Sequence, residues 1–532
     1  MNMDTSKEEG RLFKFIKGTL PVLPVLILFI WSGVRGVDFG YHWDEEKLFL
    51  LVEKAINTLI FLPSWYKYPS IPYWLCLTGL TPHLIGALQV VGLDVHAIQE
   101  HLLLVVNTPA YHLQTRIIYI LVSSLSILWV YLQPLAWKRR WLEALVAAAV
   151  LGFSWEIGYH SRWIAPDVIM MQFGTLAILC ASLAVRYPER RYWLYASAMA
   201  AGLACGTKYP GGLLVIPVLV AAYQVLIDAG IVHKLFFALI RVIPVFLATY
   251  LVSTPGTLLE PVTFVKDISY EMSHYQGLYD YSVVTPGLPH LGQILLYLAE
   301  VLFSHYRWIA VLFFILAIVG VYAFQKESRK NLFLLLSFPV LYVLYFCTQR
   351  VMIVRNLLAL APFLAILVGR GSVYVWEMLA SYSAKIKILR YAWAIVICLL
   401  LVVNGIWLVT AAESIRYRHT DHYIHQLVAY IDNHPQVSFH VSERIWRELA
   451  SLGDIGTNVS KLAGVETGMA VFYAREGLND LGKWPKNQVG LVTKLFGPWE
   501  VNFEYYPLWA GDNRIVLMPV ERVRQIGLSI LR

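Results

Sequence analysis

Long apolar stretches separated by short polar segments fill the first 410 residues of the chain. Many of them approach the roughly 20 residues that an α-helix needs to cross a bilayer. A transmembrane β-barrel would instead show alternating segments of about ten residues. The pattern therefore predicts an all-α polytopic membrane bundle. We expect about eleven spans, at 18–34, 116–135, 141–159, 168–185, 192–206, 212–227, 235–252, 308–324, 332–347, 357–368 and 391–410.

Two longer segments between spans, 35–115 and 253–290, are expected to form external loops. Within the first, apolar residues from Leu48 to Leu59 recur on one helical face, which is typical of a helix lying on the membrane surface. The apolar run 73–93 is long enough to span, but a crossing there would move every later basic cluster to the outside. We therefore place this run in the interface as well.

Composition narrows the class of protein. Hydrophobic residues make up 58% of the chain and charged residues only 15%, against about 25% in a typical soluble domain. The net charge of +8 could indicate nucleic-acid binding. However, most basic residues lie in the short loops between spans, as expected for cytoplasmic loops. We therefore expect an integral membrane protein with a cytoplasmic N-terminus and no nucleic-acid partner.

The tail, 411–532, differs from the rest of the chain. Short apolar runs alternate there with turn signals such as Asn433-His434-Pro435 and Gly511-Asp512-Asn513. This predicts a small α/β domain on the external side. The expected organisation is a membrane domain at 1–410 followed by an external domain at 411–532.

Charged side chains near the membrane are informative, because placing them there is costly unless they are paired or functional. Carboxylates mixed with cations suit the transfer of a group from a phosphate. A carboxylate removes a proton from a hydroxyl nucleophile, and cations stabilise the departing phosphate. The predicted outer face collects Asp44, Glu45, Lys67, Arg162, Asp167, Lys208, Glu260, Glu271, His274, Arg350 and Arg355.

Most of these residues also have a structural interpretation. Asp44 and Glu45 could stabilise the N-terminus of the following helix. Lys67 could extend to lipid headgroups. Arg162 and Asp167 could form a mutual structural pair.

Several motifs, taken in order, resemble the GT-C glycosyltransferases, in particular the branch of protein O-mannosyltransferases and aminoarabinose transferases. His42-Trp43-Asp44-Glu45 resembles the acidic pair that opens the first external loop of that group, and Tyr66-Lys67-Tyr68-Pro69 resembles the segment closing its first interfacial helix. Further similar segments are His160-Ser161-Arg162-Trp163-Ile164-Ala165-Pro166-Asp167, Gly202-Leu203-Ala204-Cys205-Gly206-Thr207-Lys208-Tyr209, Ser253-Thr254-Pro255-Gly256, Tyr275-Gln276-Gly277 and Arg355-Asn356-Leu357-Leu358-Ala359-Leu360-Ala361-Pro362. The resemblance covers about the first 370 residues. Ala165 departs from it, because a second arginine is common at that position.

The resemblance implies an inverting transferase that takes a hexose or pentose from a polyprenyl-phosphate donor. Asp44 would be the general base, with Glu45, Asp167 and His42 supporting it or the acceptor. A prokaryotic cytoplasmic (inner) membrane is the implied location, and a divalent metal is possible but not required. The residues implied to hold the donor phosphate are Lys67, Tyr68, Arg162, Lys208, Arg350 and Arg355.

Two other classes of protein compete with this interpretation. A transporter or flippase of lipid-linked glycans would carry charges near the bilayer midplane and paired internal repeats. A membrane scaffold that presents the external tail would leave the acidic opening unexplained. The acceptor of a transferase, whether protein, lipid or polysaccharide, is not specified by the sequence.

Overall fold

The computed structural model describes residues 18–37, 43–106, 108–227, 234–278, 283–381, 387–420, 423–452, 456–477, 492–496 and 514–525. The chain divides into two compact units. The membrane unit comprises Met1–Val34 and Leu48–Ala411, and the C-terminal unit comprises Arg35–Lys47 and Ala412–Arg532. Nothing in the sequence pattern predicts that Arg35–Lys47 would group with the tail.

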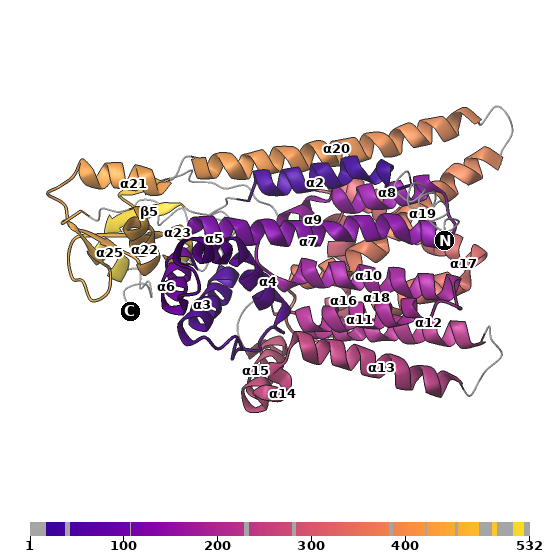
Figure 1. The fold of residues 1–532 in the computed structure, drawn as a ribbon. Coiled ribbons are helices and arrows are strands. Elements are labelled where there is room, and N and C mark those ends of the chain that lie inside the picture. The colour runs from indigo at the N-terminus through magenta and orange to yellow at the C-terminus, as the bar shows by residue number, and fades with distance from the viewer. Residues whose placement is uncertain are drawn as a thin grey trace. The chain divides into compact units, whose positions relative to one another are not determined.

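Long helices run side by side in the membrane unit (Figure 1). Of the described helices, seven are long and apolar enough to cross a membrane, or eight if one bent pair counts as one span. The helical bundle is therefore confirmed, whereas the expected number of eleven spans is not. The seven are Pro109–Ala136 (α7), Pro166–Arg186 (α10), Tyr209–Leu226 (η2 and most of α12), Arg307–Glu327 (α17), Arg329–Cys347 (α18), Val354–Ser381 (η4 and α19) and Ile388–Glu413 (within α20, Lys387–Thr420).

Helices that are not among these seven occupy the remaining expected spans. They are Leu23–Arg35 (α2), Trp141–Gly152 (α8) with Trp155–His160 (α9), Tyr192–Thr207 (α11) and Lys234–Ser253 (α13). Length alone does not assign these helices as spans, which is why the observed count is lower than the expected one.

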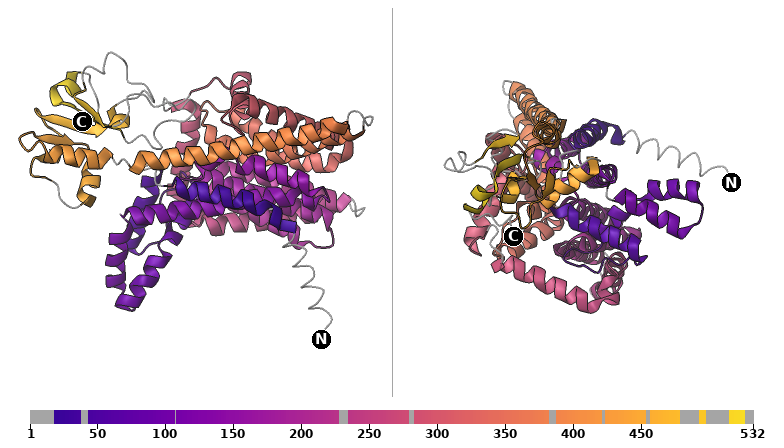
Figure 2. Two further views of the ribbon diagram at one scale, coloured as in Figure 1. Left: turned by 90° about the horizontal axis from the view of Figure 1, so that it is seen from above. Right: turned by 90° about the vertical axis from the view of Figure 1, so that its left-hand side faces the viewer.

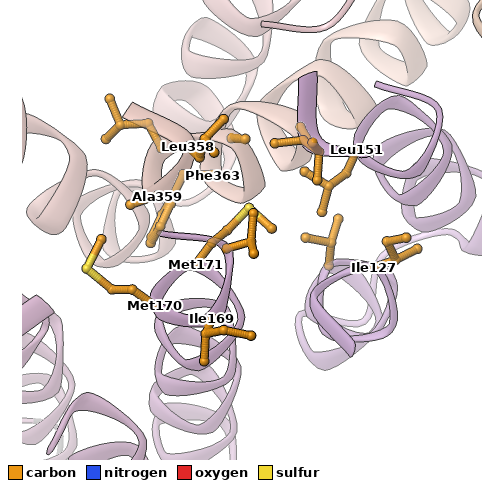
Figure 3. Packing of buried hydrophobic residues seen from close by; sticks show 14 of the residues in the cluster. Ile127, Leu151, Ile169, Met170, Met171, Leu358, Ala359 and Phe363 are labelled. Carbon is orange, nitrogen blue, oxygen red and sulfur yellow. The ribbon is translucent and has the colours of Figure 1, made fainter. Parts of the chain in front are cut away.

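Helix α10 lies in the middle of the core, in contact with α7, α11 and α12. Apolar side chains fill most of the space between them, as in a close-packed interior. Two buried hydrogen bonds add to this packing, from Gln133 on α7 to Ser182 and from Ser197 on α11 to the backbone oxygen of Ala177. Helices α17 and α19 approach each other closely, because a Cβ at Gly371 would lie 1.9 Å from the backbone oxygen of Leu316. Figure 3 shows the packing among Ile127, Leu151, Ile169, Met170, Met171, Leu358, Ala359 and Phe363.

The first external segment folds into four helices, Trp43–Thr58 (α3), Ile71–Gly79 (α4), Thr81–Val91 (α5) and Val95–Val106 (α6). Helices α4 and α5 are bent by 41° at their junction, so they form either a broken span or a re-entrant loop. Pro82 in the first turn of α5 favours the break, since proline ends the preceding helix. In Figure 2, α5 and α6 (purple) project from the bundle. Their placement in the interface stays a prediction.

The later segment, expected to be external, begins at Ser253, the last residue of α13, and its first helix begins three residues later. It contains Gly256–Leu259 (α14), Pro261–Ser273 (α15), His274–Leu278 (η3) and Leu288–Glu300 (α16). Gly277 adopts a φ of 82° inside η3, a conformation that favours glycine. These elements face the first external segment, as the contacts below show.

The C-terminal unit contains a five-stranded sheet in the order β2-β1-β3-β5-β4. Strand β1 pairs in parallel with β2 and β3, whereas β5 pairs antiparallel with β3 and β4. Apolar clusters cover both faces of the sheet. This confirms the predicted small α/β fold. The strands are Phe439–Val441 (β1), Val459–Lys461 (β2), Met469–Tyr473 (β3), Lys494–Phe496 (β4) and Ile515–Pro519 (β5), with helices Tyr423–Asp432 (α21), Glu443–Leu452 (α22), Ala474–Gly477 (α23) and Val520–Gln525 (α25).

Candidate active site in the membrane unit

Three helix ends bring Asp167, Lys208 and Arg355 together. Asp167 is the second residue of α10, which Pro166 opens, as proline commonly does. Lys208 follows the last residue of α11, and Arg355 is the second residue of η4. All three side chains are buried. The predicted positions at loop ends therefore correspond to one cluster inside the membrane unit.

The cluster is built around one carboxylate and two cations. Lys208 Nζ donates to Asp167 Oδ1 at 2.5 Å, and it also donates to the side-chain oxygen of Asn356. Arg355 Nε lies 3.5 Å from Asp167 Oδ2, which makes an ion pair but exceeds an ordinary hydrogen-bond distance. Both cations thus converge on Asp167.

Asn356 is held in place by two tyrosines. Its Nδ2 donates to the Tyr275 hydroxyl at 3.0 Å, and the Tyr342 hydroxyl donates to its backbone oxygen at 2.7 Å. The side-chain oxygen of Asn356 is thereby directed at Lys208. We did not predict Asn356, although it directly follows Arg355 in the sequence. Its neutral amide orients the lysine without cancelling the charge.

The Lys67-Tyr68 segment reaches the same group of residues. Arg355 Nη2 donates to the Tyr68 hydroxyl at 3.4 Å, so Tyr68 and the cluster are in contact. Lys67 Nζ lies 3.2 Å from the centre of the Tyr270 ring, a cation–π contact. Two regions that the sequence separates by about 290 residues therefore meet here.

The charges of Lys67 and Arg355 also shift the pKa values of two groups in the later segment, Glu271 and His274. Burial raises the pKa of Glu271, while Lys67, Lys208 and Arg355 oppose that rise. Burial lowers the pKa of His274, and Lys67 and Arg355 lower it further. Both effects favour the neutral form of the His274 imidazole.

Arg162 and Arg350 make different contacts. Arg162 Nη1 donates to the backbone oxygen of Gly158 at 2.6 Å, and Nη2 donates to that of Ser32 at 3.1 Å. Arg162 therefore does not form the mutual pair with Asp167 that was one alternative. The backbone N–H of Arg350 donates to the Tyr275 oxygen at 2.9 Å, and its side chain is exposed. Their roles at the donor phosphate stay predictions.

The acidic opening lies in the C-terminal unit. Asp44 and Glu45 occupy the first turn of α3, where carboxylates also stabilise a helix N-terminus. Glu45 is buried. His42 and the side chain of Asp44 lie outside the described residues. The general-base role of Asp44 therefore stays a prediction.

Another buried carboxylate, Glu156 on α9, was not predicted. The Tyr297 hydroxyl donates to Glu156 Oε1 at 2.6 Å, and His160 Nε2 lies 3.3 Å from the same oxygen. The four-residue spacing of Glu156 and His160 on one helix could have indicated this pair. Among the described residues, no group of three or more His, Cys, Asp or Glu side chains could hold a metal ion. Metal use stays open.

The chain is similar to one protein family model and to solved structures of membrane proteins. The family model of dolichyl-phosphate-mannose-protein mannosyltransferases matches residues 103–254, which include Asp167 and Lys208. The structure of ArnT from Cupriavidus metallidurans bound to undecaprenyl phosphate is similar, with a TM-score of 0.50 and 13% identity. Its apo structure gives 0.51 and 12%. Each alignment covers 94% of this chain and 97% of ArnT.

The chain has the ArnT fold. Its resemblance to the GT-C glycosyltransferases of the ArnT and protein mannosyltransferase branch is confirmed, and it is an integral membrane protein. A weaker likeness, with a TM-score of 0.47 and 13% identity, is to the archaeal oligosaccharyltransferase AglB from Archaeoglobus fulgidus in complex with an inhibitory peptide and a dolichol-phosphate. That alignment covers 73% of this chain and 55% of AglB. No curated protein sequence matches the chain.

Proposed function

We propose that the protein is a membrane glycosyltransferase that moves a sugar from a polyprenyl-phosphate donor to a hydroxyl acceptor, with inversion, on the external face of a prokaryotic inner membrane. The observation that carries this proposal is the contact of Lys208 and Arg355 with Asp167, beside Lys67 and Tyr68. The ArnT relative whose structure contains undecaprenyl phosphate supports the choice of donor.

The proposed reaction is a single displacement. The Asp44 carboxylate takes the proton of the acceptor hydroxyl, and the hydroxyl oxygen bonds to the anomeric carbon. The bond from that carbon to the phosphate oxygen breaks, and its electron pair leaves with the polyprenyl phosphate. Glu45 and His42 support the base, and Asp167 orients the cations.

The cations are suited to the leaving group. Charge develops on the phosphate oxygen as the bond breaks, and donors that are already in position stabilise that charge without reorganisation. Arg355 offers a planar guanidinium that can contact two phosphate oxygens, whereas Lys208 and Lys67 act as point charges. A divalent metal could add to this stabilisation, but no step depends on one. The sugar can be a hexose or a pentose.

Transfer by purified protein tests the proposal. Radiolabelled polyprenyl-phosphate hexoses and pentoses are supplied with candidate acceptors, and the parent is compared with Asp44→Asn. We expect loss of transfer in the variant, because an amide cannot accept the proton. Glu189→Gln is the matched control, since Glu189 is an exposed carboxylate between α10 and α11. Transfer retained in Asp44→Asn would reject the assigned base.

A further inference from the structure

Lys67 lies on a stretch without regular secondary structure, Leu59–Ser70, between α3 and α4. A cation that binds phosphate must be held in a defined direction, and a loop does not achieve this unaided. Residues elsewhere in the chain must therefore hold this loop in place. The described contacts point to the later external segment, about 200 residues away in the chain.

One face of α15 and its N-cap is turned toward this loop. Its residues recur every three or four positions, as neighbours on one helical face do. We call this face the inner stripe. It consists of Glu260, Phe264, Asp267, Tyr270 and Glu271.

Glu260 binds two hydroxyl groups of the loop. The Tyr66 hydroxyl donates to Glu260 Oε2 at 2.5 Å, and Ser64 Oγ donates to Glu260 Oε1 at 2.8 Å. Burial, together with the Glu260 carboxylate, raises the pKa of Tyr66. The phenol therefore remains protonated and acts as the donor. Phe264 packs edge-on against the Tyr66 ring, with 6.0 Å between ring centres.

The backbone of Tyr66 is fixed as well. Its N–H donates to Asp267 Oδ2 at 2.6 Å, and its carbonyl oxygen accepts from the Tyr209 hydroxyl at 2.5 Å. Gly256 leaves the space for the ring, because a Cβ there would lie 1.8 Å from the Tyr66 hydroxyl oxygen. Tyr66 is thus held through its side chain and both backbone groups, directly before Lys67.

The opposite face of α15 is exposed and largely apolar, although it also carries Lys266 and Ser269. Val262 is 83% and Met272 67% exposed, and Leu258 and Leu259 of α14 are exposed too. In a soluble protein this face would be polar. Such an exposed apolar face fits a helix that lies on the membrane surface, where apolar residues enter the headgroup boundary. Only two residues, Thr254 and Pro255, separate α14 from the apolar helix α13.

We propose that Glu260 and Asp267 are positioning residues for the donor phosphate, because they hold Tyr66 on a helix anchored in the membrane surface and so direct Lys67 at the phosphate. This rests on the proposed function only for the role of Lys67. Neither carboxylate touches the reacting atoms. Lys67 itself contacts the inner stripe through Tyr270, so the stripe holds both the loop and the cation.

Binding of undecaprenyl phosphate to the full chain in nanodiscs tests the proposal without requiring transfer. We expect Glu260→Ala to weaken binding about tenfold and Glu260→Gln about threefold, because the amide keeps one acceptor oxygen. Lys67→Ala is expected to weaken binding at least as much as Glu260→Ala. Glu300→Gln, which removes the carboxylate at the end of α16 that pairs with Arg307, is the control and should bind as the parent does.

A double-mutant cycle separates positioning from a general structural role. If Glu260 acts through Lys67, then Lys67→Ala with Glu260→Ala binds no more weakly than Lys67→Ala alone, within about twofold. Additive losses would overturn the proposal. Tyr66→Phe keeps the ring packing and removes only the hydroxyl bond, so it provides the same cycle should Glu260→Ala fail to fold.

The two hypotheses fail in different ways. If Lys67→Ala binds undecaprenyl phosphate as tightly as the parent, the phosphate role of Lys67 in the proposed function is wrong. If Lys67→Ala weakens binding but Glu260→Ala, Asp267→Asn and Tyr66→Phe do not, only the positioning role is wrong. Unchanged thermal unfolding in the weakened variants is the expected companion result.

Discussion

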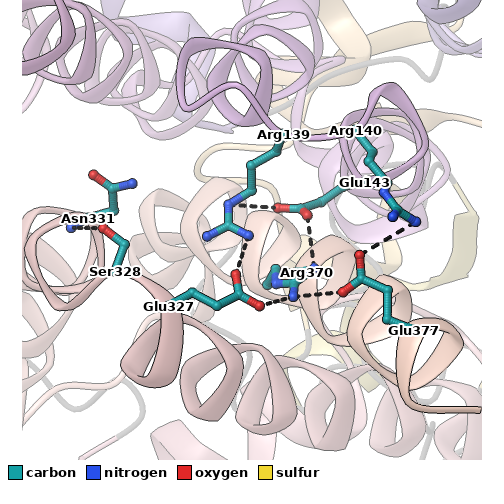
Figure 4. Close-up of polar contacts among 8 residues, drawn as sticks. All are labelled: Arg139, Arg140, Glu143, Glu327, Ser328, Asn331, Arg370 and Glu377. Atoms are coloured by element: carbon teal, nitrogen blue, oxygen red, sulfur yellow. Dashed lines mark hydrogen bonds and ion pairs between the residues drawn. The ribbon is translucent and has the colours of Figure 1, made fainter. Parts of the chain in front are cut away.

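Two charge clusters among the described residues of the membrane unit, each with a buried centre, differ in how their charges are matched. In one, guanidinium groups alternate with carboxylates across α8, α17 and α19 (Figure 4). Arg370 pairs with three carboxylates, and Arg139 joins two of them. Every charged group drawn there has an opposite partner. Its members are Arg139, Arg140, Glu143, Glu327, Arg370 and Glu377.

In the other cluster, two cations share the single carboxylate of Asp167, and a neutral amide completes the contacts of Lys208. Arg355 and Glu377 lie roughly 20 residues apart on one span, Val354–Ser381, which corresponds to roughly 30 Å. That is the thickness of a bilayer's hydrocarbon core. The clusters therefore lie toward opposite ends of this span. Matched charges stabilise helix packing, whereas cations that share one carboxylate favour an incoming anion.

Lys208→Met gives the largest expected change in activity. Methionine keeps the length and apolar stem of lysine but removes the charge that, in the proposed function, stabilises the leaving phosphate. We expect sugar transfer to fall about 100- to 1000-fold, as when one donor to developing charge is lost. Initial rates of the purified variant measure this. Lys208→Arg should recover part of the rate, and equal rates in parent and Lys208→Met would show that the cluster is purely structural.

Arg370→Met should mainly lower the stability of the protein and leave sugar transfer nearly unchanged, the reverse of what is expected for Lys208→Met. It removes the cation shared by Glu143, Glu327 and Glu377, and Glu143 is buried. Breaking a buried pair by removing one partner costs about 3 kcal/mol. We expect that loss of stability, measured by unfolding in detergent, while transfer per folded molecule stays within about twofold. Arg329→Met, at an exposed arginine opening α18, is the control.

A loss of transfer in Arg370→Met as large as that in Lys208→Met, at full stability, would remove the distinction between the clusters. The double variant provides an additional check. Because the two sites are far apart and share no partner, their effects on stability should be additive.

The helices, the small α/β tail and three residues of the candidate site could be predicted from the sequence. Apolar runs predicted the helices, because every backbone group in a bilayer must be bonded within its own helix. Asp167, Lys208 and Arg355 were predicted because charges at the ends of spans are conspicuous. The α/β tail was predicted from alternating short runs, and the sheet order could not be, since it depends on which strands meet.

Pairings between distant segments were not predictable from periodicity. Tyr66 and Glu260 are separated by 194 residues, and Asn356 and Lys208 by 148. No local pattern records such contacts, since each partner is an ordinary polar residue in its own segment. The same holds for the grouping of Arg35–Lys47 with the tail, which depends on contacts with α20 and α22.

A smaller effect is expected from pH. Burial raises the pKa of Glu271 above its ordinary value of 4.5. When ionised, the carboxylate partly neutralises the positive charge of Lys67, Lys208 and Arg355. Lowering the pH protonates Glu271 and removes a negative charge near the cations. A sugar-phosphate-lipid donor is a phosphodiester and keeps its single charge, so its KM should fall about threefold between about pH 7 and 5. Glu271→Gln should flatten this dependence, and an unchanged slope in that variant would assign it to another group.

The smallest expected effect is on local stability around the acidic opening, where the ion pairs are exposed and not centred on a buried charge. Arg447 pairs with Glu46 at 3.4 Å and is 61% exposed, and Arg35 pairs with Glu413 at 2.5 Å. Exposed pairs contribute less than about 1 kcal/mol and are screened by salt. Arg447→Gln should therefore raise hydrogen exchange in Trp43–Lys47 only a few-fold, and about 0.5 M NaCl should remove the difference from the parent. If exchange does not change at low salt, the buried Glu45 holds this turn, and the ion pairs contribute nothing measurable.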